Sequence, residues 1–457
     1  MRLLFTALAC LISVSLFGQE WMYNYGDSLQ DYGYDVQQTT DGGFIITGAT
    51  YGENRNWTDV SLMKIDVDGQ LEWHNTFGSE WTDGGSSVQQ TTDGGYIIGG
   101  YTCTSSGDLD IFLFKTDEYG IEEWSKTFGG TQDDGEACLS VQQTSDGGYI
   151  LSGYSSTFGS DSIWSDAFLL KTDENGIEEW TQTYGGIDPE LSYSVKQTSD
   201  GGYVLTGNQG WLDLWPPPSF NNQKMFLIKT DEYGIEEWTQ TYVNGMEESC
   251  SYGRDVQQTS DGGFIIAGAK GDFDTYDDSI PNQIFLGAVL VKTNQFGEEE
   301  WTSVFDQIPN LANGYSKFES VTQTSDGGFI ACGRTTFTNS SIEFPGLLFI
   351  VKTDSNGSEE WSHRVYENCI GNKVINANDG GFVITGSIWV TDLSYQAFLL
   401  KIDSEGTLSS SFTIPTPSQR KLEKVVDALG REVNQTTNQI LFYIYDDGSV
   451  EKKFIVE

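Results

Sequence analysis

Residues 141–151 read V-Q-Q-T-S-D-G-G-Y-I-L, and this stretch decides the fold because variants of it occur seven times along the chain. Two β-prone runs flank Asp-Gly-Gly, and a glycine after aspartate adopts the positive φ that a tight hairpin turn requires. Each copy is therefore predicted to be a β-hairpin. The aspartates that open the seven turns, each five residues after a valine, are Asp41, Asp93, Asp146, Asp200, Asp261, Asp326 and Asp379.

A second block, F-L-L-K-T-D-E-N-G-I-E-E-W at residues 168–180, also recurs. Its lysine is present in all seven copies and lies nine residues before a tryptophan in six of them. Two β-prone halves enclose residues 173–176, whose glycine suits a left-handed or bulge position, so the block is predicted to be a second hairpin. We expect the tryptophan to pack between sheets and the lysine to satisfy charge and backbone groups near the turn. The lysines are Lys64, Lys115, Lys171, Lys229, Lys292, Lys352 and Lys401.

Two hairpins in each repeat give four strands, and four-stranded repeats of roughly 50–65 residues are typical of the blades of a β-propeller. The chain is therefore predicted to be all-β, with a seven-bladed propeller over residues 19–412. Residues 19–26, Q-E-W-M-Y-N-Y-G, match the fourth strand of a repeat, whereas the seventh repeat ends in the degenerate residues 408–412. The N-terminal strand is thus predicted to complete the last blade, which closes the ring and removes an open sheet edge.

The composition indicates an acidic, exported protein. The 457 residues include 67 Asp and Glu against 24 Lys and Arg, for a net charge of −43, which disfavours nucleic acid as a partner. Residues 1–18 combine Arg2, an apolar run and a small residue at Gly18, as in a secretory signal peptide. No later run reaches about 18 consecutive apolar residues, so no transmembrane segment is expected.

The last 39 residues break with the repeat. Residues 424–433 read K-V-V-D-A-L-G-R-E-V, residues 441–448 read L-F-Y-I-Y-D-D-G, and residues 452–457 read K-K-F-I-V-E. Residues 419–457 resemble a short C-terminal sorting domain of type IX secretion cargo in the Bacteroidota. The resemblance implies passage across the outer membrane through the type IX machinery, which places the protein outside the cell or on its outer surface. A small β-appendage that closes the propeller is the alternative. Residues 413–418 contain two prolines and are predicted to be a linker.

The repeats themselves are similar to units of secreted bacterial surface propellers, through D-G-G-[YF] and K-T-D-x-x-G-x-x-x-W. They also resemble the Asp-box of sialidases, with gaps one residue longer, as at Asp173, Gly176 and Trp180. In that family the box braces a hairpin and has no catalytic role. The resemblance therefore implies a fold, and a fold does not define a function.

Catalytic signatures are scarce, and we expect no enzymatic activity. The only histidines, His74 and His363, follow blade tryptophans by one and two residues, so a structural role is expected for both. Neither a zinc-binding His or Cys pair nor a nucleophile elbow occurs. Propeller glycosidases that use carboxylates at the central pore exist, so a polysaccharide-active enzyme is the alternative hypothesis. A purely structural envelope component is a third.

A cofactor is not expected, with one qualification for calcium. An insertion in the fifth repeat carries closely spaced aspartates whose oxygens suit Ca²⁺, although the spacing differs from that of an EF-hand and a solvated loop is the alternative. These aspartates are Asp272, Asp274, Asp277 and Asp278. Export permits disulfides, and the positions of the cysteines within their repeats suggest Cys103–Cys138 and Cys332–Cys369 bridges, which would leave Cys250 unpaired.

Ligand binding is predicted on the face that carries the long loops. Strand alternation places both tight turns of every blade on one face, so the variable loops gather on the other, where function concentrates. Aromatic residues in these loops are candidate ligand contacts, with Trp211 and Trp215 beside three prolines the foremost pair; capping of the hydrophobic blade ends is the alternative. The candidates are Trp57, Trp164, Trp211, Trp215 and Phe220. We therefore expect a secreted or surface-displayed binding propeller that recognises glycans or surface proteins and acts in adhesion.

Overall fold

The computed structural model contains only strands within the residues that it describes. These residues are 21–26, 30–52, 57–105, 108–129, 135–158, 165–210, 223–242, 249–274, 283–305, 314–337, 346–365, 368–391, 394–407, 422–427, 431, 439–445 and 450–455. The strands are β1 (Trp21–Tyr25), β2 (Asp31–Gln38), β3 (Phe44–Tyr51), β4 (Thr58–Ile65), β5 (Leu71–Phe77), β6 (Asp83–Gln90), β7 (Tyr96–Ser105), β8 (Asp108–Thr116), β9 (Glu122–Phe128), β10 (Glu136–Gln143), β11 (Tyr149–Ser155), β12 (Asp166–Thr172), β13 (Glu178–Tyr184), β14 (Glu190–Gln197), β15 (Tyr203–Gln209), β16 (Lys224–Thr230), β17 (Glu236–Tyr242), β18 (Ser249–Gln258), β19 (Phe264–Asp274), β20 (Gln283–Thr293), β21 (Glu299–Phe305), β22 (Gly314–Gln323), β23 (Phe329–Phe337), β24 (Leu347–Thr353), β25 (Glu359–Val365), β26 (Cys369–Asn376), β27 (Phe382–Thr391), β28 (Ser394–Ile402), β29 (Leu422–Asp427), β30 (Gln439–Tyr445) and β31 (Val450–Ile455).

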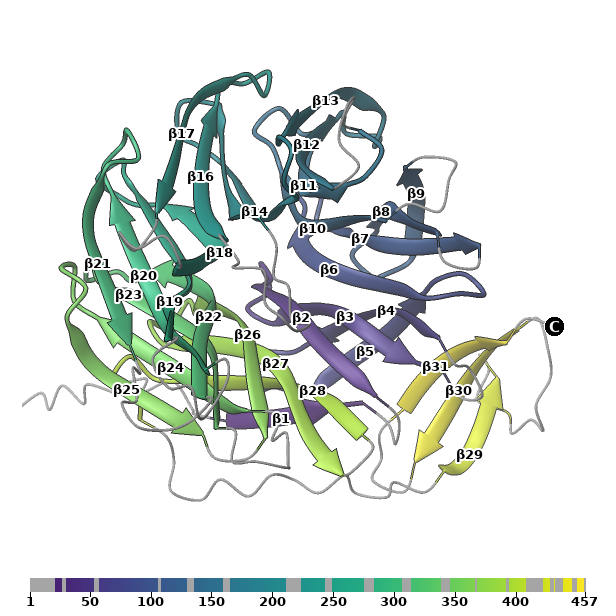
Figure 1. Ribbon diagram of the computed structural model, residues 1–457. Coiled ribbons are helices and arrows are strands. Elements are labelled where there is room, and N and C mark those ends of the chain that lie inside the picture. Colours follow the sequence, from purple (N-terminus) through teal and green to yellow (C-terminus); the bar gives the residue numbers. More distant parts are fainter. Residues whose placement is uncertain are drawn as a thin grey trace, which may run out of the picture.

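The first 28 strands form seven four-stranded antiparallel blades arranged in a ring (Figure 1). Blades 1 to 6 take four consecutive strands each, from β2–β5 to β22–β25, and the first strand of each lies innermost. Blades 5 and 6 are also joined by one parallel pairing between Leu286 and Tyr315. The predicted seven-bladed β-propeller is confirmed.

The seventh blade is closed by the N-terminal strand, as predicted. Its strand order is β26-β27-β28-β1, and β1 pairs antiparallel with β28 from Trp21 opposite Lys401 to Tyr25 opposite Ala397. The Tyr25 hydroxyl donates to the Gly69 carbonyl at 2.9 Å, and this bond connects the seventh blade to the first. The two ends of the propeller thereby hold the ring together.

One buried lysine in each blade explains why the turn of the first hairpin carries an aspartate. In blade 3 the Asp146 carboxylate accepts hydrogen bonds from the Gly148 amide at 3.0 Å and from the Thr144 hydroxyl at 2.5 Å. Lys171 Nζ lies 2.9 Å from this carboxylate and 2.9 Å from that of Glu179 in the second hairpin. Burial acts to raise the pKa of Asp146, but the hydrogen bonds from Thr144 and Lys171 outweigh it and lower that pKa. The lysine therefore joins the two hairpins, in agreement with the structural role predicted for it.

The second hairpin joins neighbouring blades. Gly176 has a φ of 72°, and a Cβ there would lie 2.6 Å from the Trp124 ring of the preceding blade. The tryptophan of one blade thus covers the turn of the next, and only glycine leaves room for it. Trp124 also packs near the Tyr149 ring, with centroids 5.9 Å apart. The expected packing of the tryptophans between sheets is confirmed.

The predicted disulfides are not formed. The four cysteines within the described residues, Cys103, Cys138, Cys332 and Cys369, are buried thiols. Cys138 Sγ lies 2.7 Å from the position of a Cβ on Gly99, and Cys332 Sγ lies 3.3 Å from that on Gly371. These sulfurs therefore fill space beside a glycine of the adjacent blade, which is why the prediction was wrong. The side chain of Cys250 lies outside the described residues.

The strands β29, β30 and β31 form a separate three-stranded antiparallel sheet at the periphery of the ring (Figure 1). They lie within residues 419–457, where the repeat pattern ends, and share no sheet with a blade. The predicted signal peptide and linker lie outside the described residues. Within the described residues, the structure has no helix that is long and apolar enough to span a membrane.

Candidate ligand site at the mouth of the central channel

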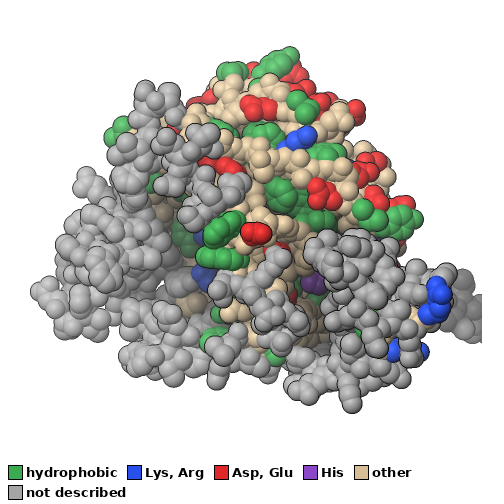
Figure 2. Space-filling model, turned by 90° about the vertical axis from the view of Figure 1, so that its right-hand side faces the viewer, with side chains coloured by type: hydrophobic (Ala, Val, Ile, Leu, Met, Phe, Trp, Pro, Cys, Tyr) green, Lys and Arg blue, Asp and Glu red, His purple; other side chains and the backbone are tan. Residues whose placement is uncertain are grey.

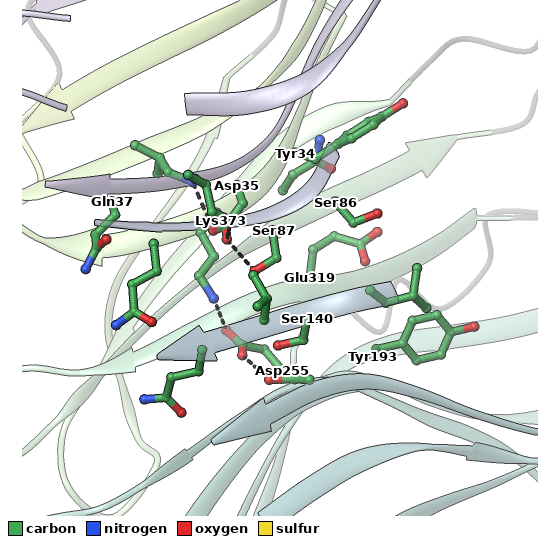
Figure 3. A pocket seen from close by; sticks show the side chains of 18 of the residues that line it. Tyr34, Asp35, Gln37, Ser86, Ser87, Ser140, Tyr193, Asp255, Glu319 and Lys373 are labelled. Carbon is green, nitrogen blue, oxygen red and sulfur yellow. Dashed lines mark hydrogen bonds and ion pairs between the residues drawn. The ribbon is translucent and has the colours of Figure 1, made fainter. Parts of the chain in front are cut away.

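A cavity of about 260 Å³ lies on the propeller axis and is lined by the innermost strands of all seven blades (Figure 3). Each inner strand starts on the face that carries the variable loops, the loop face, and runs to the Asp-Gly-Gly turn on the opposite face. Figure 3 shows Gln37 at one end of the cavity, Asp35, Asp255 and Lys373 in the middle, and Tyr34 and Tyr193 at the other end. Because Tyr34 precedes Gln37 along β2, the tyrosine end is the mouth on the loop face.

A β-bulge interrupts every inner strand at the same place and shapes this cavity. In β2 the register shifts between Gly33 and Asp35, which leaves Tyr34 as the extra residue. A bulge redirects side chains relative to a regular strand, and the bulged residue of every blade lines the cavity. These residues are Tyr34, Ser86, Leu139, Tyr193, Arg254, Glu319 and Asn372.

Asp255 of β18 connects four consecutive blades in the middle of the channel. Its Oδ1 accepts a hydrogen bond from the Ser194 hydroxyl of blade 4 at 2.9 Å. Its Oδ2 accepts from the Ser320 hydroxyl of blade 6 at 2.8 Å and from Lys373 Nζ of blade 7 at 3.0 Å. The Asp255 side chain is only 3% exposed. Asp35 occupies the equivalent position in blade 1 and accepts from the Ser87 hydroxyl of blade 2 at 3.0 Å.

The charges in the middle of the channel stabilise one another. Burial acts to raise the pKa of Asp255, but the Lys373 and Lys196 cations outweigh it and lower that pKa. Burial acts to lower the pKa of Lys373, but Asp255 and Asp35 raise it above its ordinary value. The Asp255–Lys373 pair therefore remains ionised, and this level of the channel is a structural brace.

The mouth carries a second charged group. Glu319 of β22 contacts Lys317 of the same strand, and its Oε2 lies 3.5 Å from Arg254 Nε of β18. Burial acts to raise the pKa of Glu319, but the Lys317 and Arg254 cations lower it, with a further contribution from Arg334. Burial lowers the pKa of Lys317 to about 8, although Glu319 opposes the change. Among these residues three cations surround one carboxylate.

Tyr34 and Tyr193 line the cavity, and further half-buried tyrosines lie beside them and beside Arg254. The Arg254 guanidinium lies 4.0 Å from the centroid of the Tyr193 ring and 5.2 Å from that of Tyr252. Tyr32 stacks on Tyr34 at 5.9 Å. We call the set the tyrosine arc. It contains Tyr32, Tyr34, Tyr51, Tyr101, Tyr154, Tyr193, Tyr252 and Tyr395.

The members of the tyrosine arc are near neighbours. Burial and the Tyr154 phenol raise the pKa of Tyr101, and burial and the Tyr193 phenol raise the pKa of Tyr154. On the other side, the Tyr395 ring lies 5.4 Å from that of Tyr32. The arc therefore runs from blade 7 through blades 1 to 4 and reaches Arg254 in blade 5. Phenol rings combine an apolar face with a polar edge and present contact area at low cost in conformational entropy.

Of the five candidate ligand residues named from the sequence, only Trp57 lies within the described residues. Trp57 is 44% exposed, and its ring centroid lies 5.8 Å from that of Trp81, so it belongs to an aromatic pair beside the loop face. The other four candidates, Trp164, Trp211, Trp215 and Phe220, lie outside the described residues.

The aspartates of the calcium hypothesis have side chains outside the described residues. Asp272 and Asp274 lie on β19, but their side chains are outside the described residues, as are Asp277 and Asp278 entirely. In the part of the chain that the structure describes, no three His, Cys, Asp or Glu side chains gather as a metal site would require. Both histidines lie on outermost strands, where His74 Nε2 is 2.9 Å from the Ser61 hydroxyl and the His363 ring is 5.1 Å from that of Trp361.

The brace around Asp255 and Lys373 was not predicted from the sequence, although the sequence contains a signal for it. The residue before the repeated valine is serine in four blades, but aspartate at Asp35 and Asp255 and lysine at Lys373. A charged residue that replaces the repeat consensus at one fixed position of an inner strand indicates a contact across the axis. The tyrosine arc has no such signal, because its members come from five different positions on the inner, second and third strands.

Comparison with known proteins does not assign the chain to a family. The sequence matches no model of a protein family. It is 26% identical over 267 residues to the protein named "Regulatory protein FlaEY" of Caulobacter vibrioides; the match covers 52% of this chain but only 27% of that protein.

Several solved structures are similar at low sequence identity. A protein of unknown function from Bacteroides caccae matches 70% of this chain and 93% of its own, with 11% identity and a TM-score of 0.38. One from Dyadobacter fermentans matches 83% and 97%, with 8% identity and a TM-score of 0.44. The WD40 domain of Neurospora crassa Pan2 matches 86% and 97%, with 10% identity and a TM-score of 0.47. The chain is a seven-bladed β-propeller, and its function has to be argued from its own channel and surface.

Proposed function

We propose that this protein is a binding propeller that acts in adhesion outside the cell and that its ligand enters the mouth of the central channel. The observation that carries the proposal is the tyrosine arc, which ends at Arg254 on the rim of an axial cavity. Rigid scaffolds usually place recognition residues on loops and rims of this kind. The sequence predicts that Trp211 and Trp215, which lie outside the described residues, belong to a loop on the same face.

Binding is favoured over hydrolysis by the state of the central carboxylates. A glycosidase of the usual kind needs one carboxylic acid whose raised pKa lets it protonate the leaving group, beside a second ionised carboxylate. The pKa values of Asp255 and Glu319 are lowered, and both carboxylates are held by cations. Such groups are suited to bracing and positioning, so we propose that the protein is not an enzyme.

Export through the type IX system is the second part of the proposal. It is supported by the predicted signal peptide, by the sorting-domain resemblance of residues 419–457, and by the separate sheet of β29–β31 within these residues. A strongly acidic surface also favours solubility outside the cell. Figure 2 shows acidic side chains spread over the described part of one face, with few basic ones among them.

Removal of residues 419–457 is expected to leave a folded propeller that accumulates inside the cell envelope. No blade shares a sheet with β29–β31, so few stabilising contacts are lost. Fractionation of the producing bacterium, together with a thermal melt of the purified truncated protein, measures both effects. As a control, residues 413–457 fused to a periplasmic reporter should carry it to the outside. Normal amounts of the truncated protein outside the cell would refute the sorting role, and loss of folding would favour the appendage hypothesis.

A further inference from the structure

We infer that the mouth of the channel binds the terminal sugar of an anionic glycan and that Arg254 holds its carboxylate. This inference rests on the proposed function and specifies the ligand class for the same site. It combines three observations: a charged rim, an aromatic platform and the size of the cavity.

Four described charged side chains at the rim carry a net charge opposite in sign to that of the protein. Arg254, Lys317 and Arg334 surround Glu319, so this group of four side chains carries more positive than negative charge. The chain as a whole has a net charge of −43. A local reversal of this kind concentrates an anion at the mouth, and the acidic exterior disfavours anions elsewhere.

The guanidinium of Arg254 is positioned by aromatic rings. It lies over Tyr193 at 4.0 Å and near Tyr252 at 5.2 Å, in a cation–π arrangement that fixes its plane. Its side chain is 27% exposed and lines the cavity. A guanidinium carries five N–H donors, so it can hold a ligand carboxylate in addition to the protein groups that it already contacts.

The tyrosine arc selects a sugar ring over a simple carboxylate. Phenol rings offer flat apolar faces and hydroxyl groups at their edges, which match the apolar faces and hydroxyl groups of a pyranose. The cavity of about 260 Å³ is smaller than the roughly 300–1,000 Å³ of sites for drug-sized molecules, so it admits one ring. A terminal uronic acid, with its chain directed outward across the arc, satisfies these constraints.

Calorimetric titration with sodium glucuronate and with glucose tests the inference on the full exported chain. Glucuronate should bind at least about tenfold more tightly than glucose, because a charge-assisted hydrogen bond contributes about that factor or more. Arg254→Gln should weaken glucuronate binding by about tenfold or more. Glu319→Gln should strengthen it, because it removes the competing carboxylate. An opposite response of the two variants cannot come from a general loss of folding.

Arg364→Gln is the matched control, because the Arg364 guanidinium also lies over an aromatic ring, that of Phe349 at 4.8 Å, but on the outermost strand of blade 6. It should leave the affinity unchanged. Equal affinity for glucose and glucuronate, no glucuronate binding at millimolar concentration, or unchanged binding by Arg254→Gln would overturn the inference. Equally tight binding of succinate would overturn the assignment to sugars. If the chain retains neutral glycans and Tyr193→Ala abolishes this retention, the proposed binding function stands even where the anion assignment fails.

Discussion

Deletion of β1, residues 21–25, is expected to unfold the seventh blade and lower the free energy of unfolding by about 5 kcal/mol or more. The strand packs Met22 against the core between blades 6 and 7, and Trp21 and the buried Tyr25 against the core between blades 7 and 1. Each well-buried large side chain contributes roughly 1.5–3 kcal/mol. Its loss also exposes the edge of β28, which invites pairing between molecules. Thermal melts and sedimentation of the exported chain with and without the strand measure both effects.

Two controls separate closure of the ring from ordinary loss of contacts. Tyr25→Phe removes only the hydroxyl that donates to Gly69, so it should cost about 1 kcal/mol. A synthetic peptide of residues 19–26, added to the deleted chain, should restore part of the lost melting temperature by re-forming the pairing with β28. An unchanged melt of the deleted chain would show that the ring does not depend on this strand.

Asp255→Ala is expected to destabilise the propeller by about 3–5 kcal/mol, because it leaves Lys373 in the channel without its carboxylate and removes the acceptor shared by Ser194 and Ser320. Asp255→Asn should cost nearly as much, since it keeps the shape but not the charge. Chemical denaturation of each variant gives these differences directly.

Asp35→Asn is the matched control at the equivalent position of blade 1. Its carboxylate accepts from Ser87 and from the Val88 amide and acts on Lys373 through its charge, whereas Asp255 also accepts a hydrogen bond from Lys373. Loss of the Asp35 charge should therefore cost less, about 1 kcal/mol. Similar losses for Asp35→Asn and Asp255→Asn would contradict the role given to the Asp255–Lys373 pair.

The sequence was sufficient to predict the architecture because the fold is repeated. Seven copies of an Asp-Gly-Gly hairpin and of a lysine-to-tryptophan hairpin define the number of blades. The match of residues 19–26 to a fourth strand predicted the pairing with β28 that the structure contains. A repeat that departs from the consensus can be recognised from the other six. The degenerate seventh repeat was therefore still counted as a blade.

Packing between blades could not be predicted, because it depends on pairs of residues that lie in different repeats. Near the axis, a small residue on one blade accepts a larger one from its neighbour. A Cβ on Gly85 would lie 2.3 Å from Thr47 Oγ1, and one on Gly253 would lie 2.3 Å from Thr206 Oγ1. Between blades 2 and 3 the order is reversed, with Cys138 against Gly99. Cys138 and Cys332 were therefore wrongly assigned to disulfides, whereas each is the larger member of such a pair.

The candidate site was the least predictable part. Sequence reasoning placed ligand contacts in the aromatic loops, where composition changes most between repeats. The tyrosine arc is distributed over inner and neighbouring strands, and only the curvature of the ring and the bulge in each inner strand bring Tyr34, Tyr193 and Arg254 to one rim. Alternating strand patterns predict which face a side chain takes, but not which residues of other blades it meets.

The central claim is that ligand enters at the mouth of the channel, and retention on immobilised acidic and neutral glycans tests it most directly. The exported chain is compared with Tyr34→Ala/Tyr193→Ala at the mouth and with Trp211→Ala/Trp215→Ala in the loop, each with a thermal melt. We predict that the mouth variant loses at least about tenfold in affinity while its melting temperature changes little, since both tyrosines are only half-buried. Full retention by the mouth variant, with loss only in the loop variant, would contradict the account and place the site in the loop.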